Sequence, residues 1–309
     1  MNPDTKATLD DIRIICERHG ITYQSHGRIT SGFSHEVHRL NDDLILKLYN
    51  PYGEEDERRF KTECTVLGSR LDFHKPDLVA QGTKDDAIDR NYIIMTYIPG
   101  RSLGSHWHEA TEQQREQLIA QISQTLQTIN QIDPAEITFG SVKPWDVSLG
   151  DGAKEMIDQL LAKGTLGADT ADKIHGTVEE LLPTVANSAL KPVFWDIHFD
   201  NFIVDENLDL QAVIDLEDVE LTSLDYPLFV VDKLVNDPIK YLREEDEQYA
   251  NKEDYKNLWI YYQKYYPEMF SFPHLTERVK LYTLLDSLHL LVQWPSDKQL
   301  YERINELTM

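Results

Sequence analysis

The 309-residue chain has few cysteines, a shortage of basic side chains and no long hydrophobic stretch. Only Cys16 and Cys64 are present, so we expect a reducing, cytoplasmic location and neither a disulfide scaffold nor a cysteine zinc site. No apolar run reaches the about 18 residues that a transmembrane helix needs, so no membrane partner is expected. The N-terminal residues also lack the apolar core of a secretory signal peptide.

The excess of acidic over basic residues gives a formal net charge of −24. Such a surface repels the phosphates of nucleic acids, which are therefore not expected partners. The imbalance lies mostly after Pro99, because residues 1–99 carry a net charge of −4 and residues 100–309 carry −20. The acidic second part could attract a cationic substrate, although a charge excess of this kind more often serves solubility.

The hydrophobic periodicity of the first 99 residues predicts a small lobe rich in β-structure. Residues 7–19 and 54–68 have helical spacing. Short apolar runs separated by turn residues indicate antiparallel strands, the last of them at 92–100. We therefore expect residues 1–99 to form a sheet with two helices.

Residues 100–309 are predicted to form a larger, mainly helical lobe. The segment 278–294 is apolar nearly all round and is expected to be a central helix. Two short strands around a turn are expected near 202–215, and Gly150–Gly152 is expected to form a turn of its own. The fold class that follows is α+β, with two lobes of unequal size.

Asp196, Asn201 and Asp215 place oxygen-bearing side chains among large apolar residues, which is costly unless the polar groups are partnered. A strand–turn–strand between Asn201 and Asp215 would bring all three to the base of one hairpin. Oxygen ligands of this kind suit Mg²⁺, which also takes ligands from substrate phosphates. The order Asp, Asn, later Asp is that of kinase catalytic loops, where the first Asp orients the attacking hydroxyl and the others hold the metal.

With these motifs the chain resembles the aminoglycoside phosphotransferase and choline kinase-like family, small-molecule kinases that share the protein-kinase fold. The segments that carry the resemblance are, in chain order, GRITSGFSHEVHRL, LILKLY, FKTECTVL, IIMTYIPG, DIHFDN, VIDLED and LDYP. The resemblance implies transfer of the γ-phosphoryl group of ATP or GTP, with Mg²⁺, to a hydroxyl of a small acceptor. It also implies a bilobal protein-kinase-like fold with the nucleotide in the cleft between the lobes.

The same resemblance assigns roles to individual residues. Asp196 is the expected catalytic residue, and Asn201 and Asp215 are the expected metal ligands. Lys47 would contact the phosphates and Glu63 would hold Lys47. Considered separately, Lys47 could be a snorkelling lysine and Glu63 part of a solvated helix face.

The nucleotide is expected to contact residues of the first lobe. Ser34 belongs to the hairpin that would cover the phosphates, although its sequence also suits a plain β-turn. Backbone groups of Thr96 and Ile98 would bind the edge of the adenine, with Met95 behind it. An ordinary buried strand is the alternative interpretation of these three residues.

Two positions depart from the family pattern. Phe194 and Trp195 stand where the family commonly has His-Gly before the catalytic aspartate, while His198 and Asp225 match it. Phe194 could fill a buried aromatic slot and Trp195 could reshape the substrate side. These two departures are the support for an alternative function, a catalytically weak pseudokinase that binds a nucleotide or a partner.

The acceptor is expected to be polyhydroxylated or cationic, such as an aminoglycoside or a choline-like compound. Carboxylates of residues 243–254 and aromatic faces of Trp294, Tyr261 and Tyr262 could bind a cation. A solvated acidic loop and core aromatic residues are the plainer interpretation of the same residues. Sugar, homoserine or methylthioribose acceptors also stay open.

Overall fold

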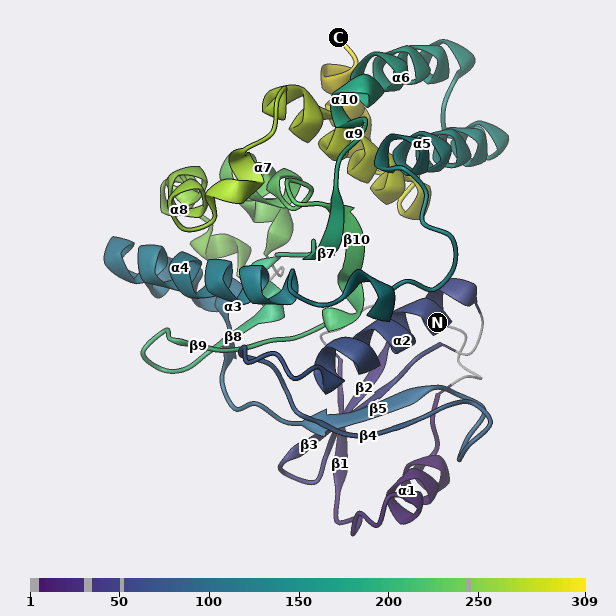
Figure 1. The fold of residues 1–309 in the computed structure, drawn as a ribbon, viewed down its shortest axis with the longest axis vertical. Helices are drawn as coiled ribbons and strands as arrows, with labels where there is room; N and C mark the ends of the chain where they lie inside the picture. The colour runs from purple at the N-terminus through teal and green to yellow at the C-terminus, as the bar shows by residue number, and fades with distance from the viewer. Residues whose placement is uncertain (1–5, 31–34, 51–52, 243–245) are drawn as a thin grey trace.

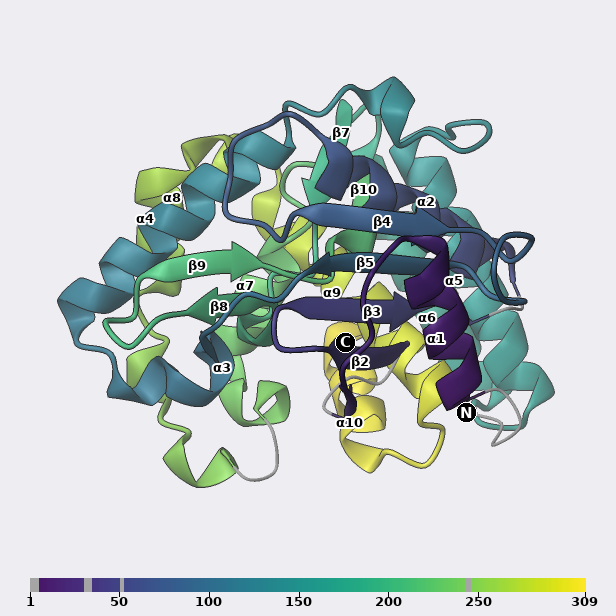
Figure 2. The ribbon, with the colours of Figure 1, turned by 90° about the horizontal axis from the view of Figure 1, so that it is seen from below.

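A computed structural model of the protein describes residues 6–30, 35–50, 53–242 and 246–309. Its first part is a five-stranded antiparallel sheet in the spatial order β1-β2-β3-β5-β4, with one helix on each face (Figures 1 and 2). The elements are α1 (Leu9–Arg18), β1 (His26–Ile29), β2 (Glu36–Leu40), β3 (Leu44–Leu48), α2 (Glu54–Gly68), β4 (Leu78–Gly82) and β5 (Tyr92–Thr96).

Side chains of β3 alternate between the two faces of this sheet. Leu46 and Leu48 pack with Ile12 and Ile15 of α1 in one small core. Lys47, between them in the strand, therefore projects from the opposite face, which α2 covers. A single polar residue in an apolar strand is thus placed on the side of the sheet that faces the rest of the molecule.

The chain passes from the first sheet to the second part through a short connection. After β5 ends at Thr96, the strand β6 (Arg101–Ser102) already pairs with β8 (Phe202–Val204). Gly100 has a φ of +156°, and a Cβ atom there would lie 2.5 Å from Ile203 Cγ2. Only glycine fits where the chain passes so close to β8. The predicted boundary after Pro99 lies within this connection.

The second part is mainly helical, as predicted. In Figure 1, α4 and α8 lie side by side at one edge, and α5, α6, α9 and α10 gather at the other end. The helix α9 is central to that group, since most of its side chains are buried. The helices are α3 (Leu103–His106), α4 (Glu112–Ile129), α5 (Trp145–Ala162), α6 (Ala168–Leu181), α7 (Leu228–Asn236), α8 (Leu258–Tyr265), α9 (Leu275–Gln293) and α10 (Lys298–Leu307).

The expectation of a turn at Gly150–Gly152 is wrong, because these residues lie inside α5. Leu149, Ala153 and Ile157 form an apolar stripe on this helix and are buried. The burial of that stripe outweighs the weak helix propensity of two glycines, which costs about 1 kcal/mol each relative to alanine.

The second part contains two small antiparallel sheets, one of β7 and β10 near its middle and one of β6, β8 and β9 on the side toward the first sheet (Figure 1). β7 (Leu190–Phe194) pairs with β10 (Val219–Ser223), with Phe194 opposite Val219. β8 pairs with β9 (Leu210–Val213), with Phe202 opposite Val213. The loops 195–201 and 214–218 are therefore held next to each other at both of their ends.

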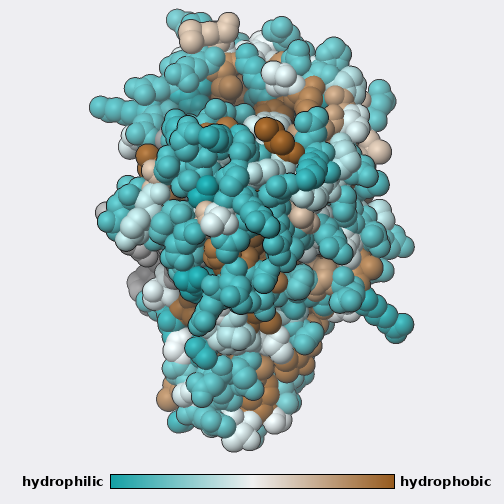
Figure 3. Space-filling model, turned by 90° about the vertical axis from the view of Figure 1, so that its left-hand side faces the viewer, coloured by the Kyte–Doolittle hydropathy of each residue, from teal (hydrophilic) through white to brown (hydrophobic). Residues whose placement is uncertain are grey.

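Charged and polar side chains dominate the face shown in Figure 3, where apolar residues form small separate groups. None of the helices in the described ranges combines the length and the apolar character that crossing a bilayer requires.

A buried ion pair joins Asp225, which follows β10, to Arg278 of α9. Arg278 donates to both carboxylate oxygens of Asp225, at 2.5 and 2.8 Å. It also donates to the carbonyl of Thr184 and to the hydroxyl of Ser188. Asp225 is completely buried, and Arg278 supplies its counter-charge.

We expect Arg278→Leu to lower the free energy of unfolding by about 3–5 kcal/mol, because it leaves the buried carboxylate of Asp225 without its counter-charge. Urea denaturation followed by circular dichroism measures this change. Lys143→Ala is the control, since Lys143 pairs with Asp151 at 2.6 Å while both side chains are more than half exposed. That surface pair should contribute less than about 1 kcal/mol, and equal losses in both variants would contradict the interpretation.

Candidate active site

The ammonium group of Lys47 lies among three carboxylates. Its Nζ is 2.8 Å from Glu63 Oε2, 3.0 Å from Asp215 Oδ1 and 2.7 Å from Glu217 Oε2. Lys47 is 3% exposed and Glu63 is 1% exposed. The interpretations of a snorkelling lysine and of a solvated helix face are therefore wrong, since both side chains are buried and paired.

Electrostatics keep Lys47 charged despite its burial. Burial would lower the pKa of this lysine, but Glu217, Glu63 and Asp215 outweigh that effect and raise the pKa well above its usual value. The pKa of Glu217 is lowered, because Lys47 and His35 stabilise its carboxylate more than burial destabilises it. The hydroxyl of Tyr49 also donates to Glu63. Lys47 thus stays positively charged among the carboxylates of Glu63, Asp215 and Glu217.

Polar side chains of the loop 195–201 are held by hydrogen bonds within that loop. The Nδ2 group of Asn201 donates to the Asp196 carboxylate at 2.9 Å and to the Asp196 carbonyl at 2.9 Å. His198 Nε2 lies 3.6 Å from the other carboxylate oxygen of Asp196. The Asp196 carboxylate is therefore oriented from two sides while it remains partly exposed to solvent.

The hairpin base brings the loop of Asn201 next to the loop of Asp215. The backbone N–H of Ile214 donates to the carbonyl of Asn201 at 2.9 Å. Asp215 itself is in the left-handed region, with φ 56° and ψ 42°, a conformation that costs a non-glycine residue about 1–3 kcal/mol. Half of the Asp215 side chain is exposed, so a carboxylate that contacts Lys47 also reaches open space.

Two acidic residues after Asp215 contribute to the site and were not assigned from the sequence. Glu217 is 3% exposed and contacts Lys47, His35 and, at 3.4 Å, Arg59 of α2. Asp218 lies 3.5 Å from Arg59. The segment VIDLED was a visible signal, but nothing in its pattern indicates which acid turns inward.

The hinge residues lie on β5 and just after it. Met95 is buried, in register with Ile45 of β3. The N–H of Thr96 donates to the Asp77 carbonyl at 3.0 Å, and the Asp77 N–H bonds the Thr96 hydroxyl rather than its carbonyl. Thr96 and Ile98 are half-buried. Ser34 lies outside the described residues.

The two departures from the family pattern pack into the second part. Phe194 is buried, with its ring at 6.5 Å and nearly perpendicular to that of Phe202. Trp195 stacks against Phe229 of α7, with 6.1 Å between ring centroids. Phe194 therefore fills a buried aromatic slot, and Trp195 contacts α7 directly beside Asp196.

A buried lysine on α7 lies within electrostatic range of Asp196. Lys233 forms an ion pair with Asp286 of α9. Burial lowers the pKa of Lys233, an effect that Asp286 and, more weakly, Asp196 oppose. A positive charge is therefore within electrostatic range of the Asp196 carboxylate on the α7 side of the loop.

The described residues among those proposed for binding a cation differ widely in exposure, and residues 243–245 lie outside the described ranges. Tyr262 is fully buried, and the hydroxyl of the buried Tyr261 donates to Glu112. Trp294 is 57% exposed. Within the acidic segment, Asp254 pairs with Arg115 at 2.8 Å. The two tyrosines are thus core residues, as the plainer interpretation predicted.

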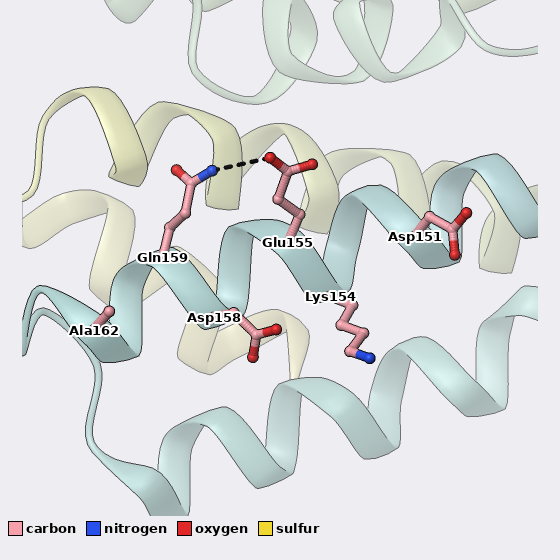
Figure 4. A pocket seen from close by; sticks show the side chains of 6 residues that line it. All are labelled: Asp151, Lys154, Glu155, Asp158, Gln159 and Ala162. Atoms are coloured by element: carbon pink, nitrogen blue, oxygen red, sulfur yellow. Dashed lines mark hydrogen bonds between the residues drawn. The ribbon is translucent and has the colours of Figure 1, made fainter.

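A depression of about 510 Å³ lies on the outer side of α5, but it is a poor candidate for the reaction. All of its lining residues come from that one helix. In Figure 4, Gln159 bonds Glu155 at 3.2 Å on one side of the helix, whereas Lys154 and Asp158 point to the other side.

The donor set near Asp215 fits a hard cation only if other ligands complete it. In the described part of the chain, no three histidine, cysteine, aspartate or glutamate side chains are arranged to hold a metal ion. Asn201 and Asp215 offer an amide oxygen and a carboxylate, which is the small protein share that Mg²⁺ takes when phosphates supply further ligands.

Comparisons with known proteins point to one family. A model of the phosphotransferase enzyme family matches residues 26–231, which is more than half of the chain. No curated protein matched the sequence.

Three solved structures illustrate the likeness in fold. The gentamicin–APH(2")-IIa complex has a TM-score of 0.72 at 18% identity, with 98% of this chain and 96% of that chain covered. The streptomycin–ATP–APH(2")-IIa ternary complex has 0.68 at 18%, covering 98% and 96%. The GDP complex of aminoglycoside 2'-phosphotransferase-IIIa has 0.68 at 14%, covering 98% and 97%. The predicted kinase-like fold is confirmed.

We expect Asp218→Asn to stabilise the protein increasingly as the pH rises from 5 to 8. Burial raises the pKa of Asp218 to about 8; Arg59 opposes this shift, and Glu217 and Asp196 add to it. An unfolded aspartate has a pKa of about 3.9, so between these values the folded state keeps a proton that the unfolded state has lost. Ionisation therefore opposes folding as the pH rises, and asparagine removes that effect. Urea denaturation at several pH values measures the difference, and a constant difference would contradict the assignment.

Proposed function

Because the chain belongs to the phosphotransferase enzyme family, we propose that it transfers the γ-phosphoryl group of ATP or GTP to a hydroxyl of a small acceptor. The observation that carries the proposal is the meeting of two loops at one lysine. Asp215 contacts Lys47, and the neighbouring loop carries Asp196 and Asn201. This is the set of groups that positioning and charge stabilisation of a phosphoryl group require.

We assign the nucleotide phosphates to the side of Lys47. Its ammonium, held by Glu63, would bind phosphate oxygens, and Asn201 and Asp215 would hold Mg²⁺. When bound, Mg²⁺ neutralises charge on the phosphates. The half-exposed side chain of Asp215 supports this role, since it pairs with Lys47 and also reaches solvent. Met95 would lie behind the adenine, whose edge would bond to the Thr96 carbonyl and the Ile98 N–H.

We assign the acceptor hydroxyl to Asp196. A carboxylate that is oriented by Asn201 and His198 but still partly exposed can accept a hydrogen bond from that hydroxyl and take its proton as the phosphoryl group is transferred. Because the carboxylate is already fixed, little ordering remains to be done when the acceptor binds.

We further propose that the acceptor is an aminoglycoside-like or choline-like amine. The net charge of −20 on residues 100–309 supports a cation, as do the aminoglycoside complexes among the similar structures. Steering by this charge would act over about 8–10 Å at physiological salt, so it favours encounter more than tight binding.

We expect Asp196→Ala and Asp215→Ala to affect different steps. Asp196→Ala should lower turnover by about 100-fold or more, since it removes the proton acceptor, and should leave nucleotide affinity nearly unchanged. Asp215→Ala should weaken binding of the Mg²⁺–nucleotide by about tenfold or more. Titration calorimetry and steady-state kinetics separate the two effects. Loss of nucleotide binding in Asp196→Ala, or unchanged affinity in Asp215→Ala, would contradict the assigned roles.

A panel of acceptors tests the function itself. We expect phosphate transfer from ATP or GTP to kanamycin, gentamicin, streptomycin or choline, and a KM that rises with added NaCl for these cations but not for a neutral sugar. Transfer only to neutral sugars would refute the cationic acceptor. Nucleotide binding without transfer to any compound would favour the pseudokinase alternative.

A further inference from the structure

We propose that His35 is a positioning residue that fixes the start of β2 to the loop that follows Asp215. The inference rests on the proposed function and adds a residue to it. His35 directly precedes β2, and its contact to the second part of the protein spans 182 positions of sequence.

The contact between His35 and Glu217 is short and buried. His35 Nε2 lies 3.0 Å from Glu217 Oε2 and 3.1 Å from Oε1. Both side chains are almost entirely shielded from solvent, and the His35 ring also packs on Tyr49 at 4.5 Å between centroids. A hydrogen bond to a carboxylate in such a setting is worth more than a neutral one.

The carboxylate that His35 contacts is the one that also contacts the phosphate lysine. Glu217 Oε2 lies 2.7 Å from Lys47 Nζ, and Glu217 Oε1 lies 3.4 Å from Arg59 of α2. Three elements of the first part, β2, β3 and α2, thus meet at one residue of the second. Without the His35 contact, the start of β2 would lose its direct bond to Glu217, the carboxylate that also pairs with Lys47.

The next residue fixes the same strand in a different way. Glu36 bonds Arg90 at 2.6 Å, His38 at 3.0 Å and the N–H of Ala7 at 3.1 Å. These partners all belong to the first part of the chain. The Glu36 contacts therefore stabilise the sheet, whereas the His35 contact sets where the sheet lies relative to the loop of Asp215.

His38 offers a matched control for His35. It is a buried histidine on the same strand, and its Nε2 also lies 3.0 Å from a buried carboxylate, that of Glu36. Its bond stays within the first sheet. Removing it should cost stability without displacing the strand from Lys47.

The experiment compares His35→Gln, His35→Asn and His38→Gln in the full chain. Glutamine places a donor where Nε2 of histidine was, whereas asparagine is one methylene too short to reach Glu217. We expect His35→Asn to weaken binding of Mg²⁺–ATP or Mg²⁺–GTP about tenfold, and His35→Gln to retain most of the affinity. His38→Gln should leave the affinity unchanged. Titration calorimetry measures affinity, and thermal unfolding reports the stability of each variant.

Several outcomes would overturn the inference. One is a His35→Asn variant that binds nucleotide as the wild type does. Another is a loss of nucleotide affinity that is proportional to the loss of Tm in the His35 variants and in the His38 variant alike. His35 would then be a stabilising residue only. A wild type that binds neither nucleotide would overturn the proposed function together with this inference, which distinguishes it from the first two outcomes.

Discussion

The buried ammonium of Lys47 is the charge around which this protein is organised. Burying it costs free energy that only close opposite charges offset, and those charges come from α2 and from the loop after β9. The strand β3, the helix α2 and the loop 214–218 must therefore keep their relative positions for the buried lysine to be stable. The protein is a phosphotransferase with a kinase-like fold, and its two parts meet at the lysine that we propose binds the phosphates.

The groups that we propose as catalytic are positioned by strand pairing rather than by long loops. The loops that carry Asp196 and Asp215 are bounded by paired strands at both ends, so a shift of one loop would break the register of the other. Asn201 adds a second constraint, because its side chain orients Asp196 while its carbonyl accepts from Ile214. Short rigid segments of this kind are well suited to hold charges at fixed separations.

Sequence reasoning reached the parts of the site that local spacing encodes. The strand of Lys47, the helix of Glu63 and the hairpin between Asn201 and Asp215 are all legible from periodicity and residue order. It failed where packing decides, as in α5, where a buried stripe holds two glycines in a helix. It also missed the bond between His35 and Glu217, because no local pattern pairs residues so far apart in the chain. The roles of the assigned residues stay predictions, and Ser34 lies outside the described residues.

The left-handed backbone at Asp215 sets a condition for engineering this protein. Asparagine adopts this conformation as readily as aspartate and would relieve the repulsion between Asp215 and Glu63, while it removes one of the three carboxylates that pair with Lys47. Directed evolution that screens for heat resistance alone has no reason to keep the aspartate that we propose as a metal ligand. A thermostabilised library of this enzyme therefore needs an activity screen as well.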